Sequence, residues 1–220
     1  MIRVECKQGS AAWHFARLGI PTASQFDRIL TAKTRKLAAG SERYMHELLT
    51  EWLLGMPHSG GSSGFMARGS GLEDEAVRYY ELQRGVTVER VGFVLRDDRL
   101  VGASPDGLVG DEGGLEIKTP SAVVHVANLL GMTDEHYAQA QGGMYVTGRK
   151  WWDLLSYNPD LPSLIVRYQR DEEYIAALDA AMTQFLANLT AARTKLLEQG
   201  CEPATSLDPD FEASLAQGTD

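Results

Sequence analysis

Cysteine and long apolar runs are both scarce in this sequence. Its 220 residues include only two cysteines, Cys6 and Cys201, which lie near opposite ends and match no metal or redox spacing. This pattern favours two free thiols in a reducing cytoplasm over a disulfide. No run of about 18 apolar residues is present, so we expect no membrane-spanning helix. The first ten residues lack the apolar core of a secretory signal.

Positive charge is also in short supply. Lysine and arginine number 21 against 30 aspartates and glutamates, which gives a formal net charge of −9. DNA-binding proteins usually carry a basic surface, so this balance at first argues against a nucleic-acid partner. Net charge does not describe local fields, however, and carboxylates that bind divalent cations reverse their own sign. The five histidines show no metal-ligand spacing.

The composition that remains suits a single domain with a sizeable core. The chain is 44 % hydrophobic and 23 % charged. We expect one domain over residues 1–200, followed by an acidic, disordered tail over residues 201–220. No internal repeat is visible.

Apolar periodicity and glycine stops predict five helices. The first opens in "PTASQFDRIL", where Thr22 and Gln25 fit a capping box. A Gly/Ser-rich stretch at 57–64 predicts a flexible loop, and Glu73 falls in the first turn of the next helix. The later helices are predicted over residues 41–54, 71–84, 134–146 and 171–199.

Runs of apolar and β-branched residues predict five strands. The predicted strands cover residues 86–95, 100–103, 115–119, 151–157 and 164–169, with "VGDEGG" as a turn between the second and third. This order of elements predicts an α/β domain in which a central mixed β-sheet is flanked by helices on both faces.

Three charged residues converge at one corner of the predicted sheet. "SPDG" places Asp106 at the end of one strand, and "LEIK" places Glu116 and Lys118 on one face of the next. A hairpin sets neighbouring strands about 5 Å apart. Two carboxylates so close repel unless a cation joins them. Hard oxygen ligands suit Mg²⁺ or Mn²⁺, with the Ile117 backbone carbonyl as a further ligand.

Two roles are open to Lys118 beside such a metal. It can act as a general base, or it can stay charged, orient a water molecule and stabilise phosphate charge. The neighbouring carboxylates favour the charged form and therefore the positioning role. Taken alone, Glu116 and Lys118 fit a surface salt bridge on a hairpin; Asp106, ten residues before Glu116, favours the metal site.

Five sequence blocks follow one another in a definite order. They are "QGSAAWHFARLGIPTAS" from Gln8, "GLEDEA" from Gly71, "SPDGL" from Ser104, "LEIKTP" from Leu115 and "HYAQAQGGMYVTG" from His136. Together they resemble the lambda-exonuclease-type, or YqaJ-like, viral recombination nucleases of the PD-(D/E)xK superfamily. The resemblance spans about residues 8–170, and five ordered blocks are far more specific than a lone PD…ExK pattern.

The resemblance implies catalytic roles for five residues. Asp106 and Glu116 match the family's metal ligands, and Lys118 matches its catalytic lysine. Glu73 matches a helix glutamate that supports the metal and water network; a helix N-terminal glutamate favoured by the helix dipole is the alternative. Gln139 matches a glutamine beside the site rather than one facing solvent. Gln141, about 200° further around the helix, is the weaker candidate.

A 5′-phosphate pocket is implied by the same resemblance. Arg17, Ser24 and Ser104 match the arginine and serines of that pocket, and an arginine can bind phosphate with two hydrogen bonds. The alternatives are a surface arginine, a helix-opening serine and a turn serine. His14 and Trp13 read as packing residues.

The resemblance also implies the reaction and its partners. We expect a Mg²⁺-dependent 5′→3′ double-strand DNA exonuclease that resects one strand from a 5′-phosphorylated end in phage or prophage recombination. It would work in the host bacterial cytoplasm beside a single-strand annealing protein, as a ring-shaped homotrimer that needs no membrane. An endonuclease or RecB-like repair nuclease, and an inactive DNA-end-binding module, are the alternatives.

Overall fold

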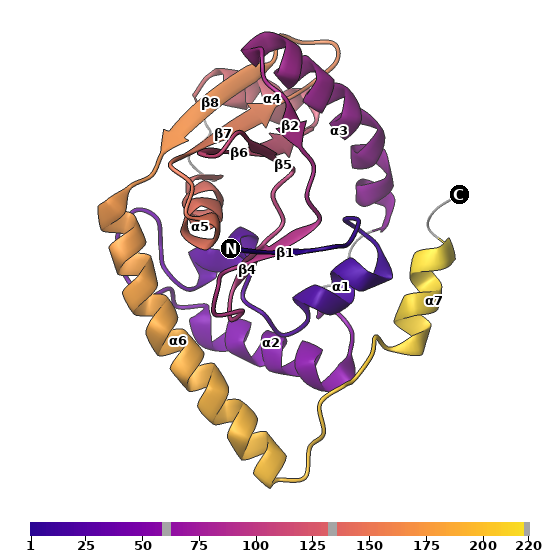
Figure 1. The fold of residues 1–220 in the computed structure, drawn as a ribbon, viewed down its shortest axis with the longest axis vertical. Coiled ribbons are helices and arrows are strands. Elements are labelled where there is room, and N and C mark those ends of the chain that lie inside the picture. Colours follow the sequence, from indigo (N-terminus) through magenta and orange to yellow (C-terminus); the bar gives the residue numbers. More distant parts are fainter. Residues whose placement is uncertain (59–62, 132–135, 218–220) are drawn as a thin grey trace.

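Two β-sheets organise the chain (Figure 1). The computed structural model describes residues 1–58, 63–131 and 136–217, without the side chains of residues 63–70, 216 and 217. The larger sheet has the order β2-β5-β6-β7-β8, formed by Val88–Glu89, Gly107–Val109, Gly113–Lys118, Trp151–Ser156 and Leu164–Gln169. The smaller sheet has the order β1-β3-β4, formed by Ile2–Val4, Phe93–Leu95 and Gly102–Ala103. Strands β6 and β7 run parallel while the other neighbours in the larger sheet are antiparallel, so this sheet is mixed, as predicted.

Helices cover both faces of the larger sheet. Helix α3 (Ser63–Arg84) packs against one face, where its Ala76 and Tyr80 join Leu115 and Ile117 of β6 in an apolar cluster. Helix α5 (Tyr137–Thr147) packs against the other face around Trp152. Because side chains alternate along a strand, Glu116 and Lys118 point toward α5 rather than α3. The predicted fold class is confirmed.

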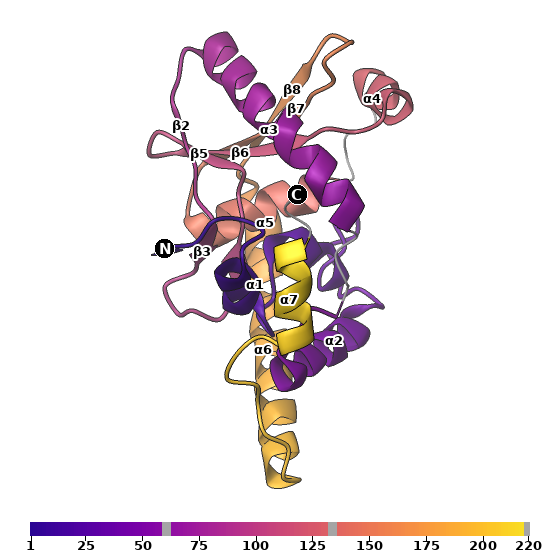
Figure 2. The same ribbon diagram turned by 90° about the vertical axis from the view of Figure 1, so that its right-hand side faces the viewer.

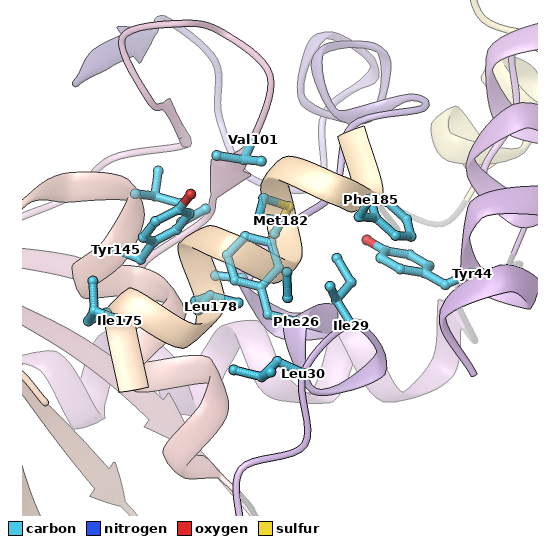
Figure 3. Close-up of a cluster of buried hydrophobic side chains, with 14 of the residues drawn as sticks. Phe26, Ile29, Leu30, Tyr44, Val101, Tyr145, Ile175, Leu178, Met182 and Phe185 are labelled. Carbon is cyan, nitrogen blue, oxygen red and sulfur yellow. The ribbon is translucent and has the colours of Figure 1, made fainter. Parts of the chain in front are cut away.

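A second layer lies below the sheet and holds the main apolar core. Helix α2 (Ser41–Leu54) matches its predicted bounds and ends at Gly55, whose φ of 70° is left-handed. Helix α6 (Glu172–Glu198) begins after Asp171, which accepts a capping hydrogen bond from the backbone of Tyr174. Figure 3 shows the side chains of α2, α6 and the 3-10 helix η1 (Ala23–Arg28) meeting there, with Tyr44 stacked on Phe185 at 5.8 Å.

The N-terminal half departs from the sequence prediction in three places. The predicted capping box is wrong, because Thr22 makes no side-chain cap bond and η1 is a 3-10 helix. The predicted strand 86–95 is divided between β2 and β3, which belong to different sheets. Helix α3 begins at Ser63 instead of Gly71; residues 59–62 of the predicted 57–64 loop lie outside the described residues.

Three helices escaped the sequence analysis: α1 (Ala11–Arg17), α4 (Ala122–Leu129) and α7 (Pro209–Gln217). The first residues of the predicted helix 134–146 lie outside the described residues, and α5 begins at Tyr137. Both cysteines are free. Within the described part of the chain, no helix combines the length and apolarity that a membrane crossing requires.

Helix α4 is inverted: it buries its polar side and exposes its apolar side. Its buried residues are polar: the His125 Nδ1 lies 2.8 Å from the Ser156 hydroxyl oxygen, and the Asn128 amide donates to that oxygen at 3.0 Å. Val123 and Leu130 on the opposite side are 82 % and 80 % exposed. Among the described residues, none from α4 joins the apolar clusters. Hydrogen bonds therefore hold this helix at the edge of the molecule (Figure 2).

The C-terminal segment, predicted to be disordered, folds back onto the domain. Asp208 donates its backbone N–H to the Gly55 carbonyl at 2.8 Å and opens α7. The Phe211 ring meets the His14 ring of α1 edge-on at 5.1 Å. Figure 2 shows α7 over α1 and α2. The acidic composition suggested a solvated tail, but Phe211 and the buried Leu207 supply apolar contacts.

Candidate active site

One pocket brings the predicted metal ligands and the predicted phosphate-binding residues together. Its volume is about 200 Å³. The lining includes Arg17, Ser24, Ser104, Asp106, Glu116 and Gln139, together with Gln8 and Trp13. Within the described part of the chain, Lys118 and Glu73 are not among the lining residues. The two sets of residues, matched separately in the sequence, therefore face one space.

Asp106 reaches the site by a different strand pairing from the one predicted. Strand β4 pairs with β3 in the smaller sheet, whereas Asp106 directly precedes β5, the partner of β6. Its backbone N–H donates to the Leu115 carbonyl at 3.1 Å, and its Oδ2 accepts from the Ile117 N–H at 2.6 Å. The hairpin that was expected to place Asp106 beside Glu116 therefore exists, but β5 forms it.

The carboxylates of Asp106 and Glu116 repel each other. Burial, and then the charge of Glu116, raise the pKa of Asp106 well above its usual value, while the Ile117 N–H opposes this rise. The charge of Glu73 adds a smaller push in the same direction. Asp106 is therefore costly to keep ionised without a cation nearby.

Glu116 is held by one donor from its own strand, β6, and one from helix α5. Its Oε1 accepts from the Lys118 Nζ at 2.8 Å and from the Gln139 amide of α5 at 2.6 Å. The Lys118 Nζ also donates to the Gln139 Oε1 at 3.3 Å. This triangle fixes the lysine and the glutamine on the α5 face of the sheet. Gln141, by contrast, is fully buried and bonds to the backbone of Gln169 and Asp171, so it serves the fold.

Glu73 acts on the pocket through its charge, which helps to raise the pKa of Asp106. It forms an ion pair with Arg90. Because α3 begins ten residues before it, Glu73 is not in the first turn, and the predicted helix-dipole alternative does not apply.

The donor set fits a hard divalent cation. Asp106 and Glu116 each engage one carboxylate oxygen with the protein, which leaves the other oxygen of each for a ligand. The Ile117 N–H points to Asp106, and the N–H and C=O of one strand residue point to the same side, so its carbonyl opens toward that carboxylate. Within the described residues, no three His, Cys, Asp or Glu side chains gather as metal ligands. Two carboxylates and a carbonyl suit Mg²⁺, which retains several waters, better than zinc.

Arg17 and Ser104 form the opposite wall of the pocket. The Arg17 Nη1 donates to the Ser104 Oγ at 2.6 Å, and its guanidinium lies 4.2 Å from the centre of the Trp13 ring. Burial lowers the pKa of Arg17 from its usual value, although the guanidinium remains charged. Ser24 is exposed beside it. Among the described residues no carboxylate forms an ion pair with Arg17, although the charge of Glu51 acts on it without such a contact. This wall therefore offers a positive charge.

Two lining residues were missed as functional candidates. Gln8 donates to the Pro105 carbonyl at 3.0 Å, directly before Asp106. Trp13 donates from its indole N–H to the Ser104 Oγ at 2.9 Å. Both lie in the first sequence block, where Trp13 reads most simply as a core residue. The position of Trp13 four residues before Arg17, on one helix face, was the available signal.

Comparison with known proteins assigns the chain that forms this pocket to a family. The YqaJ-like viral recombinase domain matches residues 12–150, which include every predicted site residue. The chain belongs to the YqaJ-like viral recombinase domain family. No curated protein sequence matches it.

Solved structures support the YqaJ-like assignment. An alkaline exonuclease from Laribacter hongkongensis is 35 % identical, with a TM-score of 0.74 over 86 % of this chain and 96 % of that one. The same enzyme has also been solved in complex with dAMP. A phage-related exonuclease from Haemophilus somnus 129PT is 16 % identical, with a TM-score of 0.61 over 79 % of this chain and 96 % of that one. The Haemophilus protein shares the fold.

Proposed function

We propose that this YqaJ-like protein is a Mg²⁺-dependent 5′→3′ double-strand DNA exonuclease, with Mn²⁺ as a substitute ion. The observation that carries the proposal is the single pocket in which a carboxylate pair faces an arginine that forms no ion pair with a described carboxylate. Such a pocket suits a DNA strand whose terminal phosphate binds at the arginine wall while a phosphodiester bond is hydrolysed at the carboxylate wall. The Laribacter relative, an alkaline exonuclease solved with a nucleoside monophosphate, supports the same chemistry.

Each wall of the pocket has a part in the proposed reaction. Arg17, Ser24 and Ser104 bind the 5′-terminal phosphate. Asp106, Glu116 and the Ile117 carbonyl hold Mg²⁺, which when bound polarises the scissile phosphate and lowers the pKa of a water ligand.

Lys118 is the residue that we assign to positioning the water. Glu116 and Gln139 hold its ammonium group in place by hydrogen bonds. From there it orients the attacking water and stabilises charge that develops on the phosphate. Glu73, paired with Arg90, supports the site from α3.

Membership of the family supports a proposal for the biological setting. We propose that the protein resects DNA ends in phage or prophage recombination in the host bacterial cytoplasm. A single-strand annealing protein would load on the exposed 3′ strand, and a ring-shaped homotrimer would keep the enzyme on its substrate.

The direct test compares linear and closed circular duplex DNA. We expect Mg²⁺-dependent degradation of the linear form, faster from 5′-phosphate than from 5′-hydroxyl ends, and intact circles. Lys118→Ala should lower the rate by about 10²-fold or more, in the range for loss of one oriented catalytic group. EDTA should abolish it.

Four outcomes would contradict the proposal. Full activity of Lys118→Ala, or activity in EDTA, would remove the assigned chemistry. Cleavage of closed circles would indicate an endonuclease or a RecB-like repair nuclease. Unchanged DNA in both Mg²⁺ and Mn²⁺, despite tight end binding, would indicate an inactive end-binding module.

A further inference from the structure

We propose that Trp13 is a positioning residue that makes Ser104 a hydrogen-bond donor to the terminal phosphate. This inference rests on the proposed function, because it concerns the phosphate-binding wall of the same pocket. It adds a residue with no charge and no contact with the carboxylate pair to the recognition of the DNA end.

The Ser104 oxygen already accepts two hydrogen bonds. The Trp13 indole N–H donates to it at 2.9 Å, and the Arg17 Nη1 donates at 2.6 Å. A hydroxyl has two acceptor lone pairs and one hydrogen to donate. With both lone pairs engaged, Ser104 can only donate further, and no described residue accepts that hydrogen. The hydroxyl is therefore set to meet an acceptor such as a phosphate oxygen in the pocket.

Trp13 also places the Arg17 guanidinium. The cation lies 4.2 Å from the centre of the Trp13 ring and 5.6 Å from that of Phe93. Aromatic contacts attract a guanidinium without neutralising it, whereas a carboxylate would cancel its charge. The arginine is thus oriented and still available to an anion.

The tryptophan itself is fixed from two sides. Its backbone N–H donates to the Ser10 hydroxyl at 3.3 Å at the start of α1, and its indole N–H is shared with the Gly92 carbonyl at 3.1 Å. Gly92 packs so closely on the Cys6 backbone that an added Cβ would lie 1.9 Å from the Cys6 oxygen. One acceptor of the indole N–H, the Gly92 carbonyl, is therefore packed tightly against the segment that precedes α1.

Trp13→Phe tests the inference, because it keeps an aromatic ring and removes the N–H. The measurement is the ratio of kcat/KM for 5′-phosphorylated over 5′-hydroxyl linear duplex. Loss of one hydrogen bond to a charged group typically corresponds to about tenfold in an equilibrium or rate ratio. We expect the ratio to fall by about tenfold. Trp13→Phe should lower it no further in a Ser104→Ala background, since both changes remove the same donor to phosphate.

Gln8→Met is the matched control. Gln8 joins the same two segments as Trp13, through the Val91 and Pro105 carbonyls at 3.2 and 3.0 Å, but does not contact Ser104. General loosening of the pocket should lower both rates equally and leave the ratio unchanged. If Trp13→Phe fails to fold, replacement of Trp13 by benzothienylalanine preserves the ring shape and exchanges the N–H for sulfur.

The outcomes separate the two proposals. A wild-type preference for 5′-phosphate that survives Trp13→Phe or benzothienylalanine overturns the role of Trp13 and leaves the nuclease intact. Equal wild-type rates on both ends overturn the phosphate pocket and the inference together. The absence of any degradation overturns the proposed function itself.

Discussion

Asp106 is the residue at which function and stability oppose each other. Its burial and the charge of Glu116 make its ionised form unfavourable in the folded protein, yet an ionised pair is what would attract a divalent cation. Active sites commonly retain strain of this kind because the ligand relieves it. The free protein should therefore be less stable than the same fold without this charge.

Asp106→Asn should raise the thermal stability of the metal-free protein. The substitution removes the repulsion with Glu116 and keeps an oxygen for the Ile117 N–H. Each kcal/mol regained shifts Tm by about 2–4 °C in a chain of this size. We expect such an increase in EDTA at pH 8, measured by calorimetry, together with loss of nuclease activity. Mg²⁺ should stabilise the wild type and not the variant; a variant with lower Tm in EDTA would contradict the account.

Site residues could be predicted where their partners lie close in the sequence. Asp106, Glu116 and Lys118 were found because a hairpin connects them within twelve residues. Gln139 was placed by the resemblance and its helical phase. The contact of Trp13 with Ser104 could not be predicted, because the two residues are 91 positions apart and are brought together by the β1-β3 and β3-β4 pairings.

Helices α1 and α7 form a contact that links α7 to the wall of the pocket that carries Arg17. Helix α1 carries Trp13 and Arg17 on the pocket side and His14 on the side that meets Phe211. Burial, and then the charge of Arg17, lower the pKa of His14 below its usual 6.5. The folded state therefore holds His14 neutral.

The docking of α7 should weaken in mild acid. A histidine whose folded-state pKa is lowered contributes full stability above about pH 6.5. That contribution is lost as the pH falls below 6.5 toward the folded-state pKa. We expect amides of residues 210–217 to exchange faster at pH 5.5 than at pH 7.5, after correction for intrinsic exchange.

His14→Phe and Phe211→Ala are the controls for this effect. His14→Phe keeps the ring contact without a titrating group, so in this variant the protection of the α7 amides from exchange should not change with pH. Phe211→Ala should expose α7 at both pH values. Equal protection of the wild type at pH 5.5 and 7.5 would show that His14 does not govern the docking.

Short elements account for most of what the sequence did not predict. Helices α2 and α6 were found because their apolar stripes extend over several turns. Helix α1 has only seven residues, and α4 buries polar rather than apolar residues, so neither displays the expected periodicity. Strand β5 has only three residues; Val109 was assigned to a turn, and Gly107 and Leu108 were assigned to no strand.

The charge of the whole chain is compatible with a DNA substrate. The net charge is −9. The pocket nevertheless contains the carboxylate pair of Asp106 and Glu116, which can bind a cation, and an arginine, Arg17, that forms no ion pair with a described carboxylate. A ring would need positive potential only along its channel, and an acidic exterior would reduce non-specific contact with DNA.

Solution mass tests the ring directly. We expect light scattering to give about three times the 24.1 kDa of one chain, independent of concentration across the micromolar range. A monomer mass would remove the ring and any processivity that depends on it, while leaving the chemistry of the pocket unaffected.

The inverted helix α4 also has a consequence for heat capacity. Its attachment includes the hydrogen bonds of His125 and Asn128 to Ser156 and that of the His125 Nε2 to the Pro162 carbonyl, while Val123 and Leu130 remain in water. Detaching it exposes little new apolar surface, so its release should carry a small heat-capacity change. The apolar core weakens on cooling because its stability depends on such surface. The edge helix and the core should therefore respond to temperature along different curves, with α4 the less sensitive to cold.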